Sequence, residues 1–208
     1  MKDKILCLII CLFLFSNVAI LGQALSGDYY IPKGSNPQGF TTLAEAINTF
    51  NINGCNGTVT FLLDDNLQEN GNALFINRND LTADNKLIIK PALNKQPIIT
   101  IINCEGNVAV NQFAGLTITS KYVTINGSNN GSSSRDLLFK LNDAVNGKYV
   151  LFLYDDSDNI TIKNIKVEIQ AGIGTESYGI FAKGSTTNAN DNLLIDNCEI
   201  GNWDYRLS

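Results

Sequence analysis

Asn159–Val167 reads NITIKNIKV, and Asn192–Ile200, which begins 33 residues later, reads NLLIDNCEI. In both stretches a short apolar segment, a single polar bend and a second apolar segment follow one another. Lys121–Asn126, KYVTIN, matches the first half of this unit about 37 residues earlier. A unit that recurs after thirty-odd residues is typical of a solenoid, in which each repeat forms one coil and stacks on the next.

The asparagines have a physical reason in such a coil. The chain must bend sharply between two strands, and asparagine tolerates the left-handed backbone conformation that the bend needs. Stacked coils lie about 4.8 Å apart, so equivalent side-chain amides can bond from coil to coil. We predict an asparagine ladder of Asn126, Asn164 and Asn197, an interior stack of Ile125, Ile162 and Ile195, and a stack of Phe152 on Phe181 in the preceding strand.

Most of the chain after residue 57 reads as short strands separated by Asn, Asp, Gly and Ser clusters. The expected strands are 58–63, 86–90, 98–102, 116–119, 122–125, 137–141, 149–154, 160–162, 165–169, 178–182 and 193–195. An antiparallel sandwich also has many short strands, but its turns favour two-residue hairpins at regular spacing. We therefore predict an all-β protein, a right-handed parallel β-helix with three strands in each coil.

One helix is expected before the coils. Residues 42–45, TLAE, form a capping box, in which the Thr42 hydroxyl accepts from the Glu45 amide and the Glu45 carboxylate reaches back. The apolar positions that recur at helical spacing are Leu43, Ala46, Ile47 and Phe50. Asn53 and Gly54 supply a left-handed stop, so the helix should end near residue 52. An open solenoid end exposes strand edges and core, and an amphipathic helix suits the duty of covering it.

The first residues read as a targeting segment. Lys2 and Lys4 precede an apolar run over residues 5–15, and small residues follow at Gly22 and Ala24, the positions that a signal peptidase reads. The run is too short to cross a hydrocarbon core of about 30 Å as a helix. We expect a signal peptide over 1–24, an N-terminal segment with the capping helix over 25–57, and β-helix coils over 58–208.

Three further stretches carry a resemblance to a known family: Ser26–Pro32 (SGDYYIP), Phe40–Ile47 (FTTLAEAI) and Gly57–Phe61 (GTVTF). Together they resemble the start of pectin-lyase-like right-handed β-helix proteins, and more specifically the N-terminal regions of large secreted bacterial surface proteins. The resemblance covers most of residues 26–204 and implies that the early helix caps the solenoid. It specifies an activity poorly, because this fold hosts lyases, hydrolases, esterases and adhesins.

Composition limits the partners. From Leu25 onward the chain has 13 Lys and Arg against 19 Asp and Glu, a net charge of −6, so it lacks the basic stripe that nucleic acid requires. Without histidine, a metal site built on the cysteines is disfavoured. Cys55, Cys104 and Cys198 read as small buried residues, and a Cys55–Cys104 disulfide is the alternative in an oxidising compartment.

Few residues suggest chemistry. Asp155, Asp156 and Asp158 form the densest carboxylate group and are candidates for a Ca²⁺ site, against a local turn in which such residues cap backbone amides. The resemblance adds that lyases of this fold often use calcium on acidic sugars. Trp203 and Tyr205 are candidates for glycan contact, against packing on neighbouring coils. No residue is assigned a catalytic role and no other cofactor is expected.

The sequence favours a secreted or cell-surface scaffold, adhesin-like, whose partners are polysaccharides or another surface protein. The alternative is the N-terminal part of an extracellular polysaccharide lyase or glycoside hydrolase whose active groove lies on later coils. No second capping segment follows Ile200, so we expect either further coils beyond Ser208 or a partner that covers this end, and favour the first. No membrane span is expected after signal removal.

Overall fold

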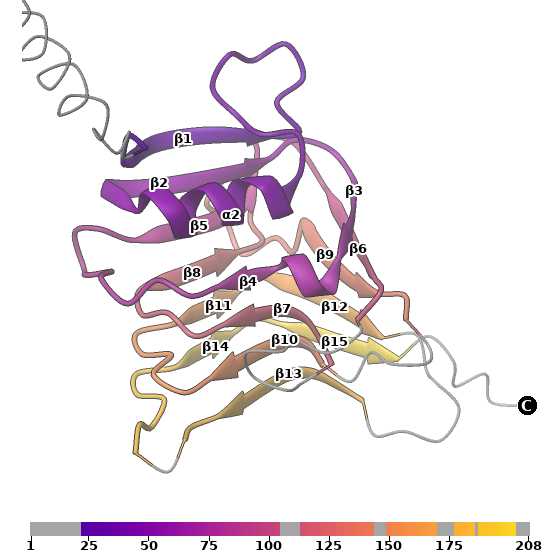
Figure 1. The fold of residues 1–208 in the computed structure, drawn as a ribbon. Coiled ribbons are helices and arrows are strands. Elements are labelled where there is room, and N and C mark those ends of the chain that lie inside the picture. The colour runs from indigo at the N-terminus through magenta and orange to yellow at the C-terminus, as the bar shows by residue number, and fades with distance from the viewer. Residues whose placement is uncertain (1–21, 105–112, 144–148, 170–176, 186, 203–208) are drawn as a thin grey trace, which may run out of the picture.

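The computed structural model describes residues 22–104, 113–143, 149–169, 177–185 and 187–202. Its strands form three parallel sheets that stand around one core (Figure 1). Sheet A contains β1 (Leu25–Ile31), β2 (Cys55–Leu63), β5 (Leu87–Pro91), β8 (Val123–Asn126), β11 (Thr161–Lys163) and β14 (Leu194–Asp196). Sheet B contains β3 (Leu67–Asn70), β6 (Ile98–Ile102), β9 (Leu137–Leu141), β12 (Ile165–Ile169) and β15 (Glu199–Asn202). Sheet C contains β4 (Phe75–Ile76), β7 (Ala114–Ile118), β10 (Tyr149–Tyr154) and β13 (Tyr178–Lys183).

From β2 onward the chain passes through sheets A, B and C in turn. Strands β2 to β4 make coil 1, β5 to β7 coil 2, β8 to β10 coil 3 and β11 to β13 coil 4, while β14 and β15 begin coil 5. Each strand inside a sheet therefore hydrogen-bonds to the equivalent strands of the coils before and after it, and the strand at either end of a sheet has one such neighbour. The structure confirms the predicted parallel solenoid with three strands in a complete coil.

The core runs up the middle of the coils. Ile162 pairs in register with Ile125 on one side and Ile195 on the other, as predicted. Ile125 and Ile162 are fully buried, whereas Ile195 is 46% exposed because it lies on the last strand of sheet A that the structure describes. In β9 and β12 alternate residues point inward, which gives these strands an alternating pattern of buried and more exposed positions.

Helix α2 (Leu43–Asn53) packs on the first coil, against β1, β3 and β4. Its apolar stripe is fully buried, and the residues that form it are Leu43, Ala46, Ile47 and Phe50. The Thr42 hydroxyl accepts from the Glu45 amide at 3.0 Å, as the capping box predicts. The Glu45 carboxylate accepts from the amide of Thr41 at 2.8 Å, one residue before the cap. Gly54, at φ 71°, ends the helix.

Two polar side chains join this helix to the free edges of the first coil. Glu69 of β3 is 3% exposed, and its carboxylate accepts from the amides of Leu43 at 2.6 Å and Ala44 at 3.3 Å. Asn51 donates to the carbonyl of Phe75 in β4 at 2.6 Å. The Phe75 carbonyl belongs to the first strand of sheet C, and the amides of Leu43 and Ala44 begin the helix, so these bonds use backbone groups that would otherwise remain unpaired at a sheet edge and at a helix end.

Candidate functional site

The candidate site lies at the corner where the chain turns from sheet C to sheet A. Ser120 and Ser157, 37 residues apart, follow β7 and β10 and are both fully buried. The Ser157 hydroxyl lies 2.7 Å from the carbonyl of Ile118, in the coil before, and 2.8 Å from that of Tyr154. The Ser120 hydroxyl accepts from the amide of Arg78 at 2.6 Å. At this corner coil 2 is thus joined to coil 1, and coil 3 to coil 2.

A cleft of about 480 Å³ follows the corner across four coils. Its lining residues are Phe75, Asn77 and Asn79 from coil 1, Thr119 from coil 2, Tyr154, Asp155 and Asp156 from coil 3, and Asn188 from coil 4. Coils repeat about every 4.8 Å, so the cleft extends roughly 14 Å along the solenoid axis. Because the coils are fixed to one another, the lining side chains stand on a rigid support.

An ion-pair network borders the cleft. The Lys121 ammonium lies 2.8 Å from a carboxylate oxygen of Asp156 and 2.9 Å from one of Asp158. The other Asp158 oxygen accepts from the amide of Asp191 at 2.8 Å. Hydrogen bonds from the Asp191 amide and from Lys121 lower the pKa of Asp158, and hydrogen bonds to Asp156 and Asp158 raise the pKa of Lys121. Asp158 and Lys121 are therefore each stabilised in their charged forms.

The same network bears on the calcium expectation for Asp155, Asp156 and Asp158. Two of these three carboxylates share the Lys121 ammonium group instead of converging on an empty position. Asp155 has φ 60°, and its carboxylate accepts from the side-chain amide of Asn188 at 3.5 Å. Within the described ranges, no group of three or more His, Cys, Asp or Glu side chains could hold a metal ion. The contacts thus pair Asp156 and Asp158 with Lys121 and join Asp155 to Asn188 of the next coil.

Aromatic side chains occupy the outer face of sheet C beside the cleft. Leu151 and Leu153 join the core, so Phe152 between them points outward, in register with Phe181 of β13. Val150 also joins the core, which breaks the alternation and returns Tyr149 to the outer face. The pairing of Phe152 with Phe181 that the sequence predicts is therefore present, on the outside of the solenoid.

The rings of this outer cluster stack on one another. Tyr149 lies 4.7 Å from Phe181 and 5.1 Å from Phe152, centroid to centroid. Tyr154, which also lines the cleft, lies 5.5 Å from Phe152 at an interplanar angle of 26°. Tyr178 adds an outer ring that is 39% exposed. Rings held in this way keep a fixed orientation, and the tyrosines combine a flat apolar face with a polar hydroxyl.

The predicted asparagine ladder lies at the other end of sheet A, away from this corner. Asn164 donates to the side-chain oxygen of Asn126 at 2.9 Å, and Asn197 donates to that of Asn164 at 2.7 Å. Asn164 and Asn197 have φ values of 57° and 48°. Arg135 donates to the Asn197 side-chain oxygen at 2.9 Å. The amides are therefore used by the coils themselves, and the ladder is a structural feature.

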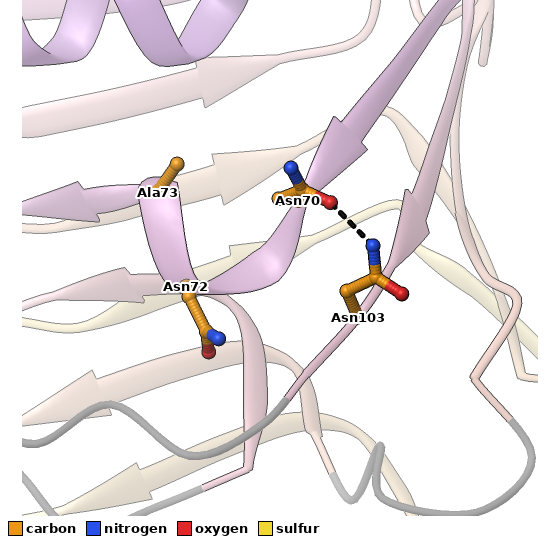
Figure 2. Close-up of a pocket in the computed structure, with 4 residues that line it drawn as sticks. All are labelled: Asn70, Asn72, Ala73 and Asn103. Atoms are coloured by element: carbon orange, nitrogen blue, oxygen red, sulfur yellow. Dashed lines mark hydrogen bonds between the residues drawn. The ribbon is translucent and has the colours of Figure 1, made fainter.

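A second hollow, of about 350 Å³, lies at the corner between sheets B and C (Figure 2). It is lined by Asn70, Asn72, Ala73 and Asn103, and Asn103 donates to the side-chain oxygen of Asn70 at 2.7 Å. Asn103 also has a positive φ of 52°. A hydrogen bond between asparagine side chains of successive coils thus occurs at this corner as well. No ionisable group is among the described residues that line this hollow, so the cleft is the stronger candidate.

Other expected residues stand apart from the cleft. Cys55, Cys104 and Cys198 are free thiols, and burial, with the nearby Asp143, raises the pKa of Cys104 to about 12. The Cys55–Cys104 disulfide alternative is thus wrong. Trp203 and Tyr205 lie outside the described residues, as does most of the expected signal peptide.

Several cleft residues were not expected from the sequence. Phe75, Asn77 and Asn79 follow or belong to a strand of only two residues, which gives no periodic signal. Asn188 could have been found, since it lies 33 residues after Asp155 and this is the offset of the repeat.

Comparison with family models, curated proteins and solved structures found no match for this chain. Among the described residues, no helix is long and apolar enough to cross a membrane. The site must therefore be interpreted from its own geometry.

Proposed function

We propose that this chain is a β-solenoid module of a secreted or cell-surface protein, an adhesin-like scaffold that contacts glycans without cleaving them. The observation that carries the proposal is the cleft, in which side chains from four successive coils line one continuous surface. The basic group beside it, Lys121, is occupied by Asp156 and Asp158 and so is engaged in structure. A rigid surface with aromatic and amide side chains is suited to binding.

Two features of the sequence support the same proposal. The basic start, apolar run and small residues over 1–24 fit export. The resemblance of Ser26–Pro32, Phe40–Ile47 and Gly57–Phe61 to pectin-lyase-like right-handed β-helix proteins fits a family in which many members act outside the cell. Another surface protein is the second kind of partner that such a module could contact.

Export and binding can be tested together on the full chain. After expression with its own N-terminus, the protein is expected in the medium or at the cell surface, with Leu25 as its first residue by N-terminal sequencing. Immobilised neutral and acidic polysaccharides should retain it, and reducing ends and unsaturated products should stay at background. Release of oligosaccharides by the full chain would replace this proposal with the lyase or hydrolase alternative. Retention in the cytoplasm, together with no binding to any polysaccharide, would overturn both.

A further inference from the structure

We propose that the cleft binds an uncharged, hydroxyl-rich oligosaccharide whose chain lies along the solenoid axis. This inference rests on the proposed function and specifies the ligand class of the same site. The volume of about 480 Å³ falls within the range of small-ligand sites, about 300–1,000 Å³. Its lining residues come from four coils, so the long dimension of the cleft runs across the strands. An extended chain of sugar rings fits this shape better than a single ring.

The apolar contact would come from Tyr154 and Phe75. Tyr154 is half-buried, and Phe152 supports one side of its ring at 5.5 Å. Phe75, also half-buried, comes from coil 1 on the other side of Thr119. One face of a pyranose ring exposes C–H groups, which pack favourably on the electron-rich face of an aromatic ring. The two rings thus offer apolar surfaces at separate points along one axis.

The polar contacts would come from three amides and one carboxylate. Asn77, Asn79 and Asn188 are exposed and line the cleft, and each side chain both donates and accepts hydrogen bonds. The Asp155 carboxylate adds an acceptor. The side-chain amide of Asn188 donates to it over a long distance of 3.5 Å. Sugar hydroxyls also donate and accept, so a neutral saccharide can satisfy both kinds of group.

Charge argues against an acidic saccharide. Among the described residues that line the cleft are the carboxylates Asp155 and Asp156, and none of these described residues is Lys or Arg. The nearby Lys121 is held by two carboxylates, and Arg78 is paired with Asp80. A uronate entering the cleft would place its negative charge near Asp155, where Lys121 and Arg78 are already paired with carboxylates, which disfavours that ligand. Lys183 pairs in register with Tyr154 but does not line the cleft, which makes it a useful control.

The experiment is calorimetric titration of the exported full chain with four probes: the linear tetrasaccharides of glucose, mannose, xylose and galacturonate. At least one neutral probe should bind, and tetragalacturonate should bind at least tenfold more weakly. Because the ligand is uncharged, raising the salt concentration should change the dissociation constant less than about twofold. Asn188→Ala and Asp155→Gly should each weaken binding by about tenfold, the effect of one lost hydrogen bond. Glycine accepts the φ of 60° at position 155, so the second variant adds no backbone strain. Tyr154→Leu should weaken it likewise, and Tyr154→Phe should not.

Lys183→Ala should bind as the unchanged chain does, and the thermal midpoint of every variant should be checked so that unfolding is not mistaken for lost contact. The inference is overturned if no neutral probe binds, if tetragalacturonate binds most tightly, or if binding depends on Lys183 and falls steeply with salt. In each of these cases the proposed function survives when polysaccharide still retains the full chain through another surface. Loss of all glycan retention would remove the proposed function as well.

Discussion

Asn164 donates to the side-chain oxygen of Asn126 at 2.9 Å although the two backbones are not opposite one another. Asn126 pairs in register with Lys163, and Gly127 lies beside the bend at Asn164. A Cβ atom at Gly127 would stand 1.9 Å from the Asn164 carbonyl oxygen, so this position requires glycine. The side chain of Asn126 thus reaches past its register partner Lys163 to bond with Asn164, where the backbone at Gly127 lies close to the Asn164 carbonyl.

Replacing Asn164 by glycine should lower the free energy of unfolding by about 2 kcal/mol, because the two ladder hydrogen bonds to Asn126 and Asn197 are lost. Glycine accepts a positive φ, so backbone strain does not contribute. Asn94→Gly is the matched control, since Asn94 has φ 62° and is exposed. Urea unfolding measures both. Equal effects at the two positions would show that the ladder adds nothing.

The carboxylate of Glu69 should be required for docking the capping helix. Glu69→Ala leaves two amides at the start of α2 without their acceptor and should cost about 2 kcal/mol, whereas Glu69→Gln keeps an acceptor oxygen and should cost less. Thermal unfolding of the two variants provides the comparison. An alanine variant as stable as the glutamine variant would contradict this role.

The same residue gives a dependence on pH. Burial raises the pKa of Glu69 above its ordinary value, and the amide bonds from Leu43 and Ala44 partly oppose this. The folded state then holds the proton more tightly than the unfolded state, so the contribution of Glu69 to stability is greatest below its unfolded pKa and is lost as pH rises through the folded pKa. Glu69→Gln should lack this decline when unfolding is measured across the acidic range.

The coils could be predicted from the sequence because the interior positions of their strands carry β-branched and apolar side chains and alternate with more exposed positions. Strands β6, β9, β10 and β12 have the bounds that the sequence predicts. In the first coil the sequence predicts β2, over 58–63, but neither β3 nor β4. In β3 the inward position is Glu69, which serves α2, and so the strand reads as polar; β4 has two residues, too few for a period. Strand β1 was also missed, since only Leu25 and Ile31 of it are buried.

The cleft could not be predicted from the sequence in the same way. Its residues follow the ends of sheet C strands in coils of unequal length, so their alignment depends on how each turn folds. Ser157 shows this, because its two carbonyl partners determine where Asp155 and Asp156 stand, and neither partner is visible as a motif. The calcium candidates show the same limit. Two of these neighbouring carboxylates form ion pairs with Lys121, which lies 37 residues before Asp158 in the sequence.

The outer aromatic cluster should stabilise the fold, although it is not part of the core. Phe152 is fully buried by its neighbours, so Phe152→Ala should lower the free energy of unfolding by about 3–5 kcal/mol, as for a core ring. Phe181→Ala should cost about 1–2 kcal/mol, since this ring is only half-buried. Chemical unfolding of both variants tests the order. A larger loss of stability for Phe181→Ala than for Phe152→Ala would contradict the central role of Phe152 in this cluster.

The ionised carboxylate of Asp158 should stabilise the fold, and this contribution should be lost in acid. Its pKa is lowered in the folded state, first by the Asp191 amide and then by Lys121, so its contribution is present above the unfolded pKa of 3.8 and is lost as pH falls through the lower folded value. Asp158→Asn should therefore be less stable than the unchanged chain at pH 6, and the gap should close below pH 3.8. Asp84→Asn, which removes the same charge at an exposed turn, is the control. A gap that stays constant across the acidic range would show that Asp158 acts through the shape of its side chain, and that the ion pair with Lys121 contributes nothing to the corner.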